Sequence, residues 1–122
     1  MKTAYLTTTA IIVLAALSSA AECAELPANV QEQVEAQVQQ MRSAGVPAEA
    51  ARDMLTTMHR YRFTDETIAS VQQETMHCAK AGLPTAPMMN KAMEGMAKQA
   101  SEQQIVAAVA AVHSRYAQAD RI

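Results

Sequence analysis

The chain has 122 residues, a formal net charge of −2 at pH 7 and a hydrophobic fraction of 50%. This charge balance excludes the basic patch that nucleic acids and anionic lipids require. The sequence contains no Trp and a single Phe, so it predicts a core of Ala, Val, Met and other aliphatic side chains. A chain of this length is expected to form one small domain.

The first 21 residues are typical of a secretory signal peptide. Lys2 supplies a positive charge, residues 10–17 form an unbroken apolar run, and small residues occupy positions 18–21. These are the three parts of such a leader, and the apolar run is far shorter than the roughly 20 residues that span a bilayer. Small side chains at Ser19 and Ala21 favour cleavage after Ala21. We therefore expect an exported protein, periplasmic or secreted, with no membrane span after the leader is removed.

Helical periodicity begins after a short N-terminal extension at residues 22–27. A first helix is predicted over residues 28–43, with Pro27 suited to its start and Gly45 to its end. A second helix is predicted over residues 47–61. Apolar residues recur at helical spacing in both segments, at Val30, Val34, Val38 and Met41 and at Ala51, Met54, Leu55 and Met58.

The third predicted helix starts at the N-cap residue Thr64 and ends near Lys80, where Gly82 terminates it. The fourth lies within residues 85–99, because Thr85 can cap it and Pro87 falls in its first turn. The residues expected to point inward are Ile68, Val71, Thr75 and Cys78 in the third helix and Met89, Ala92, Met93 and Met96 in the fourth.

Gly95 lies in the middle of the fourth helix, where it costs about 1 kcal/mol relative to Ala. We therefore expect a neighbouring helix to approach its backbone closely. Ser101 and Gln104 form a capping box that starts the fifth helix. This helix is expected to end near Tyr116 and to leave residues 118–122 as a frayed tail. Its inward residues are Ile105, Val109, Val112 and Tyr116, and its many Ala residues suggest that neighbours cover it on two sides.

The chain also repeats itself. Residues 44–80 and 81–117 align without a gap at an interval of 37 residues, and Ala44-Gly45-Val46-Pro47 matches Ala81-Gly82-Leu83-Pro84. A fixed period of this length predicts a helical-hairpin repeat. The first helix matches the second half of a unit, so the layout is half a repeat followed by two repeats. We predict an all-α fold of five antiparallel helices over residues 28–117, as a small bundle or a short solenoid.

The block from Gly82 to Lys98 resembles the pattern G-[LIV]-P-x-x-P-[LM]-x-x-K-x-x-E-G-x-A-K. This pattern is similar to one found in small, exported bacterial helical proteins of uncharacterised function. The matching residues are Gly82-Leu83-Pro84, Pro87-Met88, Lys91, Glu94-Gly95 and Ala97-Lys98. With the helix that follows, the match covers about a third of the chain, and the first repeat departs from it, with Met58 in place of Gly95. The resemblance implies export and a helical fold, and brings no known activity.

Lys91, Glu94 and Lys98 share one face of the fourth predicted helix. A catalytic Lys–Glu pair would need a desolvated cleft, whereas the spacing of Glu94 and Lys98 is that of a surface ion pair on a helix. The sequence has no Ser-His-Asp grouping with a plausible elbow, no phosphate-binding Gly loop and no carboxylate-rich metal loop. We therefore expect no catalytic residue and no enzymatic activity.

Soft metal ligands are predicted to gather at one end of the bundle. The first, third and fifth helices end where the fourth begins, and this end carries Met76, His77, Cys78, Met88, Met89 and His113. Thioether, thiolate and imidazole ligands together favour Cu(I). Against a metal site, Met is a flexible core filler, and consecutive helical residues point about 100° apart. Core packing is the simpler interpretation, and a Cu(I) site is the alternative.

Cys23 and Cys78 are not expected to form a disulfide. Cys23 precedes the first helix at one end of the bundle, and Cys78 ends the third helix at the other end. The separation along the axis is about 16 residues, or roughly 24 Å. A disulfide requires Cα atoms within about 7 Å.

These observations favour a non-enzymatic interaction or self-association module. Repeat scaffolds present surfaces, and a groove lined by Ala and Met accepts an amphipathic helix of a protein partner or of a second copy. One alternative is a periplasmic Cu(I)-binding protein. Another is a small helical periplasmic chaperone, although the LTxxQ pattern of such chaperones is missing, since Thr57-Met58-His59 follows Leu55-Thr56.

Overall fold

The structure, a computed structural model, describes residues 25–120 as five α-helices joined by short turns. The helices are α2 (Ala28–Ala44), α3 (Ala48–Arg60), α4 (Asp65–Lys80), α5 (Ala86–Ala97) and α6 (Glu102–Asp120). Residues 25–120 contain no strand, so the predicted all-α class is confirmed. The expected leader, residues 1–21, and Cys23 lie outside the described residues.

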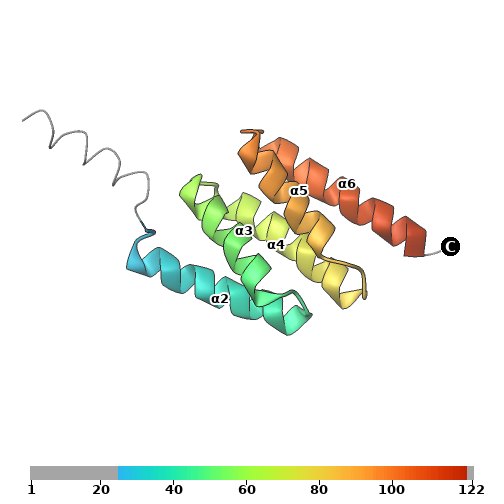
Figure 1. The fold of residues 1–122 in the computed structure, drawn as a ribbon, viewed down its shortest axis with the longest axis horizontal. Helices are drawn as coiled ribbons and strands as arrows, with labels where there is room; N and C mark the ends of the chain where they lie inside the picture. The colour runs from blue at the N-terminus through green and yellow to red at the C-terminus, as the bar shows by residue number, and fades with distance from the viewer. Residues whose placement is uncertain (1–24, 121–122) are drawn as a thin grey trace, which may run out of the picture.

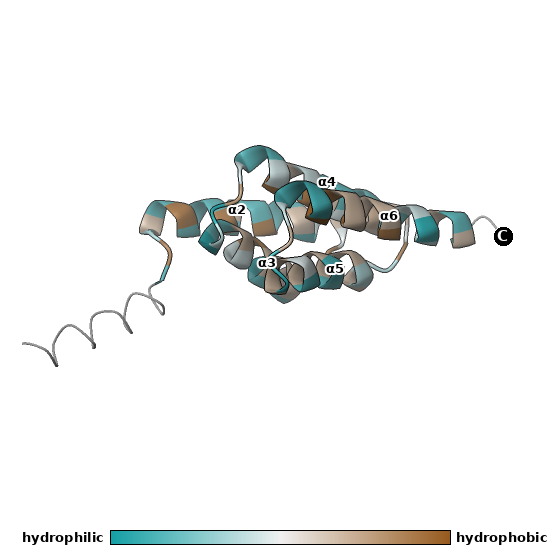
Figure 2. Ribbon diagram, turned by 90° about the horizontal axis from the view of Figure 1, so that it is seen from above, coloured by the Kyte–Doolittle hydropathy of each residue, from teal (hydrophilic) through white to brown (hydrophobic). Residues whose placement is uncertain are grey.

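The helices form two layers (Figures 1 and 2). α2, α4 and α6 lie side by side in one layer, and α3 and α5 form the other. Consecutive helices run in opposite directions, so α2, α4 and α6 all run the same way (Figure 1). The most extensive contacts join α5 to α6 and α2 to α3, whereas α3 and α4 touch little although they are consecutive. α4 therefore lies between two closely packed hairpins.

Each helix buries the stripe that its apolar spacing predicts. On α3, for example, Ala51, Met54, Leu55 and Met58 are completely buried, and together they form one face of a helix with 3.6 residues per turn. The buried core consists of Val34, Val38, Met41, Val46, Ala51, Met54, Leu55, Met58, Ile68, Val71, Cys78, Met88, Met89, Ala92, Met96, Ile105, Val109 and Val112.

The turns explain where the helices end. Gly45 and Gly82 have φ angles of +106° and +77°, a left-handed conformation that glycine adopts without steric cost. The amide of the next residue then bonds back into the helix, from Val46 to Met41 and from Leu83 to Cys78, both at 3.0 Å. Arg62 and Gln99, both at φ +58°, end α3 and α5 in a similar way. Each of these two pairs of turns is separated by 37 residues.

Two predicted caps are confirmed and one is wrong. The Thr64 hydroxyl accepts the amide of Thr67 at 3.2 Å. Ser101 and Gln104 exchange side-chain bonds with each other's amides at 3.0 and 3.2 Å, as in a capping box. Thr85 makes no such side-chain bond, because its own backbone is already helical, with φ −92° and ψ −23°, and its side chain is buried.

Three further expectations about the helices are corrected. α6 continues beyond Tyr116 to Asp120, since Ala117, Gln118 and Ala119 are good helix formers and no Gly or Pro stops the helix. Met93 is 36% exposed rather than inward, because the buried face of α5 is centred on Met88, Ala92 and Met96, one turn apart. Tyr116 is likewise 38% exposed, since it lies in the last turns of α6, beyond the last buried residue of that helix, Val112.

Gly95 lies against α6, as its position in the middle of a helix predicted. A Cβ atom built on Gly95 would be 2.7 Å from Cγ1 of Ile105, far inside normal van der Waals contact, and Ile105 is 1% exposed. The absence of a side chain therefore allows α5 and α6 to form one of the two closest hairpins. The residue that precedes Gly95 by 37 positions is Met58, which is completely buried and lies on α3, where no comparable approach to α4 occurs.

We predict that Gly95→Ala destabilises the domain even though Ala is the better helix former. The helix gains about 1 kcal/mol, while forcing a methyl group against Ile105 costs about 1–3 kcal/mol. In an Ile105→Ala background the methyl group has room, so the same substitution should stabilise the domain by up to about 1 kcal/mol. Urea unfolding of the wild type, both single variants and the double variant measures this coupling. Equal effects of Gly95→Ala in both backgrounds would contradict it.

Candidate functional site

Two open grooves lie on the layer formed by α2, α4 and α6. One lies between α2 and α4 and the other between α4 and α6, with volumes of about 660 and 510 Å³. Their rims carry exposed residues such as Gln40, Ala69, Gln73 and Ala107, so the grooves open to solvent on the side away from α3 and α5. We call this side of the three helices the outer face.

Most of the residues that line the α2/α4 groove are polar. The Gln72 amide is 7% exposed and donates a 2.9 Å hydrogen bond to Oε1 of Gln40, which ties α4 to α2. Met76 is the only large apolar side chain in the lining, so the expected groove of Ala and Met is here a groove of Gln and Ala with one Met. The lining residues are Gln40, Ser43, Ala44, Ala69, Gln72, Gln73, Met76 and Lys80.

The α4/α6 groove has a floor of short side chains and is flanked by two polar contacts. Its lining includes Ser70 on α4 and Val106, Ala107 and Ala110 on α6. Near the start of both helices, Oε1 of Glu102 accepts bonds from the amide (2.9 Å) and the hydroxyl (3.1 Å) of Thr64. These bonds from Thr64, together with Thr67, hold the pKa of the Glu102 carboxyl below its usual value.

The second polar contact between α4 and α6 lies toward their C-terminal ends. Nδ1 of His113 is 2.6 Å from Oε2 of Glu74, and both side chains are partly buried, at 21% and 33% exposed. Together with the Thr64–Glu102 contact, this pair fixes the register of α4 and α6 on either side of the groove. Glu102 lies 38 residues after Thr64, the N-cap residue of α4, and His113 lies 39 residues after Glu74.

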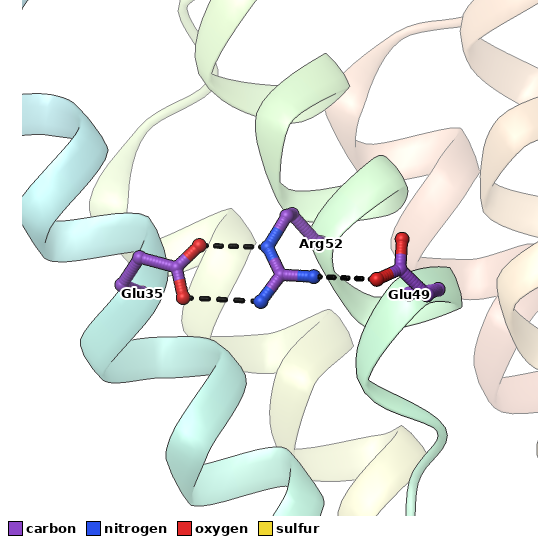
Figure 3. Close-up of polar contacts among 3 residues, drawn as sticks. All are labelled: Glu35, Glu49 and Arg52. Carbon is purple, nitrogen blue, oxygen red and sulfur yellow. Dashed lines mark hydrogen bonds and ion pairs between the residues drawn. The ribbon is translucent and has the colours of Figure 1, made fainter.

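α2 and α3 are joined by an arginine that bridges two carboxylates (Figure 3). The Arg52 guanidinium donates to both oxygens of Glu35, at 2.7 and 3.1 Å, and to Glu49 at 3.1 Å. The bond from Arg52 lowers the pKa of Glu35, so the pair stays ionised. Because Glu35 and Glu49 are well exposed, this contact orients the hairpin more than it stabilises it.

The group Lys91, Glu94 and Lys98 forms surface ion pairs, as their spacing predicted. Glu94 is 2.8 Å from Lys98 and 3.6 Å from Lys91, and the bond from Lys98 followed by the charge of Lys91 lowers the pKa of Glu94. These side chains are 39–71% exposed. They line a shallow groove between α5 and α6, together with Gly95 and Gln104.

The six candidate metal ligands lie in different surroundings. Cys78, Met88 and Met89 belong to the core, and the Cys78 thiol donates to the Pro84 carbonyl at 3.2 Å. His77 is exposed, whereas Met76 is half-buried and lines the α2/α4 groove. His113 is held by Glu74. The consecutive residues 76–78 thus face a groove, solvent and the core, as their angular separation requires.

The protonation state of Cys78 also argues against a metal site. Burial first, and then the charge of Glu74, raise the pKa of the Cys78 thiol, which disfavours the thiolate form that binds metals. Among residues 25–120, no group of three or more His, Cys, Asp and Glu side chains is arranged to hold a metal ion. Met88 and Met89 act as core side chains.

Sequence reasoning did not identify the outer face as a site. The Ala pairs at residues 107–108 and 110–111 signalled a helix with little bulk, and we expected neighbours to cover it on two sides. α4 and α5 do contact α6, but Ala107 and Ala111 remain exposed. The Arg52–Glu35 bridge joins residues 17 positions apart, so no local spacing rule could have indicated it.

Comparison of the chain with known protein families, with curated proteins and with solved structures gives no match. The function is therefore argued from the geometry of the chain itself. Within residues 25–120, no helix combines the length and apolar character needed to cross a membrane.

We predict that the purified chain loses Cu(I) to a competing chromophoric chelator in an anaerobic titration. Met88 and Met89 are buried, Cys78 is a hydrogen-bonded thiol, and His113 is held by Glu74, so binding would require the core to open. Stoichiometric competition that weakens when Met88 and Met89 are replaced by Leu would contradict this expectation and establish metal handling. Helicity measured on the same samples controls for unfolding.

We also predict an acid-sensitive contribution of Glu102 to stability. Its pKa is lower in the folded state, so the contribution is complete above the unfolded-state pKa and is lost as the pH falls through the folded-state pKa. Glu102→Gln keeps an acceptor and removes the charge. The variant should therefore melt below the wild type at neutral pH, and the difference should vanish in acid. Glu32→Gln, an exposed position of α2, is the matched control, and a pH-independent difference for Glu102→Gln would contradict the prediction.

Proposed function

We propose that the protein is a non-enzymatic, exported interaction module whose outer face binds another protein chain. One observation carries this proposal. α3 and α5 cover one side of the α2, α4 and α6 layer, while the opposite side carries two open grooves between parallel helices. Such grooves match the ridges of a further helix, which is how helices pack on one another.

The chemistry of the outer face suits a helical or extended peptide partner. The α4/α6 groove offers Ser70, Ala107 and Ala110, short side chains that let a second backbone approach closely. The α2/α4 groove offers the amides of Gln40 and Gln72 for polar contacts. A partner that covered both grooves would complete a third layer on the domain.

Export is the second part of the proposal. It is supported by the charged start, apolar run and small residues of positions 1–21, which predict a processed chain that begins at Glu22. Cu(I) binding and a chaperone role are the alternative functions. No contact among residues 25–120 specifically supports either of them. A chaperone would differ from the proposed module by binding many unfolded chains rather than one partner.

Site-specific photo-crosslinking tests the proposal. A photoreactive residue at Ala69 in the α2/α4 groove or at Ala107 in the α4/α6 groove should give a discrete adduct with a single partner in cells. The same residue at Asp53, an exposed position of α3 on the other layer, should give none. Mass spectrometry of the adducts identifies the partner, which is then titrated with the purified chain.

Three results would contradict the proposal. Adducts of equal yield from Asp53 and the groove positions would mean that the contact is not specific to the outer face. A broad smear of adducts would indicate a chaperone instead. The absence of any adduct at Ala69 and Ala107 in intact cells would leave the grooves without a ligand.

A further inference from the structure

The described chain divides into two units at the turn between α3 and α4, residues 61–64. The first unit is the α2–α3 hairpin, whose helices are joined by the Arg52–Glu35 bridge. A 3.2 Å contact between the His59 ring and the Gln37 side chain also joins them. The second unit consists of α4, α5 and α6, in which α6 packs closely on both of the other helices.

Few polar contacts join the two units. They pack on each other through α3 with α5 and through α2 with α4. Within residues 25–120, the Gln72–Gln40 bond is the one side-chain hydrogen bond between the units. Thr64 belongs to the second unit, because its amide and its hydroxyl both donate to Glu102 of α6. Separating the units would therefore leave intact the side-chain hydrogen bonds inside each unit.

The turn that links the units is strained. Arg62 has a φ angle of +58°, a left-handed conformation that is costly for a residue with a Cβ atom. The turn closes by backbone hydrogen bonds of its own, such as that from the Phe63 amide to the Met58 carbonyl at 3.1 Å. Gln99 has the same φ angle, but it connects α5 and α6, which pack closely. The helices that the Arg62 turn connects touch little, so their packing does not offset its strain.

A short, strained link between two units favours their exchange between copies of a chain. When the turn opens, Arg62 can adopt an ordinary φ angle, and the second unit of one copy can pack on the first unit of another. The α3–α5 and α2–α4 contacts then form between copies, so the core remains buried. Tyr61 in the link is 50% exposed. Since four residues span at most about 14 Å, Tyr61 would lie beside the second copy in the exchanged form.

We propose that residues 61–64 are a hinge through which two copies of the chain exchange units to form a two-fold, domain-swapped dimer. Each half of this dimer consists of α2 and α3 of one copy and α4, α5 and α6 of the other. The exchange is reciprocal, so the assembly closes on itself. The inference is independent of the proposed function, because each half of the dimer carries a complete outer face.

Substitutions of Arg62 test the role of the strain. Glycine adopts a positive φ angle freely, whereas a β-branched residue is strongly disfavoured there. Arg62→Gly should therefore weaken the dimer and Arg62→Val should strengthen it, each by at least about tenfold in Kd. Size-exclusion chromatography of samples equilibrated just below the melting temperature and then cooled measures the two populations. Circular dichroism verifies that each variant keeps its helices.

The same changes at Gln99 are the matched controls. The turn between α5 and α6 lies inside the second unit, so it stays closed in both the monomer and the dimer. Gln99→Gly and Gln99→Val should therefore leave the dimer Kd unchanged, whatever they do to the melting temperature. Effects equal to those of the Arg62 variants would overturn the hinge. A wild type that is strictly monomeric after equilibration would overturn the dimer, as would Arg62 variants that dimerise equally.

A mixing experiment tests the exchange itself. One preparation carries Gln40→Cys on α2 and the other carries Gln73→Cys on α4, both exposed positions that line the α2/α4 groove. A bis-maleimide should link the two substituted positions when the chains are unfolded and refolded together, because α2 of one copy then packs on α4 of the other. Folded chains that are only mixed should give no such link. Equal linking in both samples would indicate a dimer formed by surface contacts and refute the exchange.

Discussion

The close approach of α5 to α6 at Gly95 is the constraint on which the arrangement of the helices depends. A glycine in the middle of a helix costs about 1 kcal/mol relative to Ala, and the contact with the buried Ile105 side chain offsets this cost. Thirty-seven residues earlier in the chain, Met58 occupies the corresponding position, and its long side chain is completely buried. The pair α5 and α6, which carries the glycine, packs closely, whereas the pair α3 and α4, which carries the methionine, does not.

The loose packing of α3 against α4 has a structural consequence. Because α3 and α4 do not close on each other, α4 packs between α2 and α6. Three parallel helices then share one layer, and polar contacts such as Gln72–Gln40 and Glu102–Thr64 join them. The two grooves of the outer face lie between these parallel helices.

Local structural features were predictable from the sequence because they depend on residues that are only a few positions apart. The helical stripes, the caps at Thr64 and Ser101, the left-handed turn at Gly45 and the Glu94–Lys98 pair all follow rules that act within about one turn of helix. The need for a close neighbour at Gly95 followed from its cost in a helix. In each case the determining atoms lie near one another in the chain.

The pairing of helices was not predictable in this way. Which helices pack together depends on side-chain volumes on both sides of an interface, and consecutive order suggested an α3–α4 contact that is nearly absent. For the same reason the sequence did not show that Met93 is exposed on α5 or that Ala107 is exposed beside a groove. The candidate site was therefore the part least accessible to sequence reasoning, because it consists of what the packing leaves uncovered.

The most direct test of this account is a nuclear Overhauser experiment on the isotope-labelled chain in solution. The account predicts strong cross-peaks between the α protons of Gly95 and the side-chain protons of Ile105, because a Cβ atom at Gly95 would lie within 2.7 Å of Ile105 Cγ1. It also predicts weak or no cross-peaks between α3 and α4 away from their connecting turn. Missing Gly95–Ile105 cross-peaks in a folded sample would contradict the central claim.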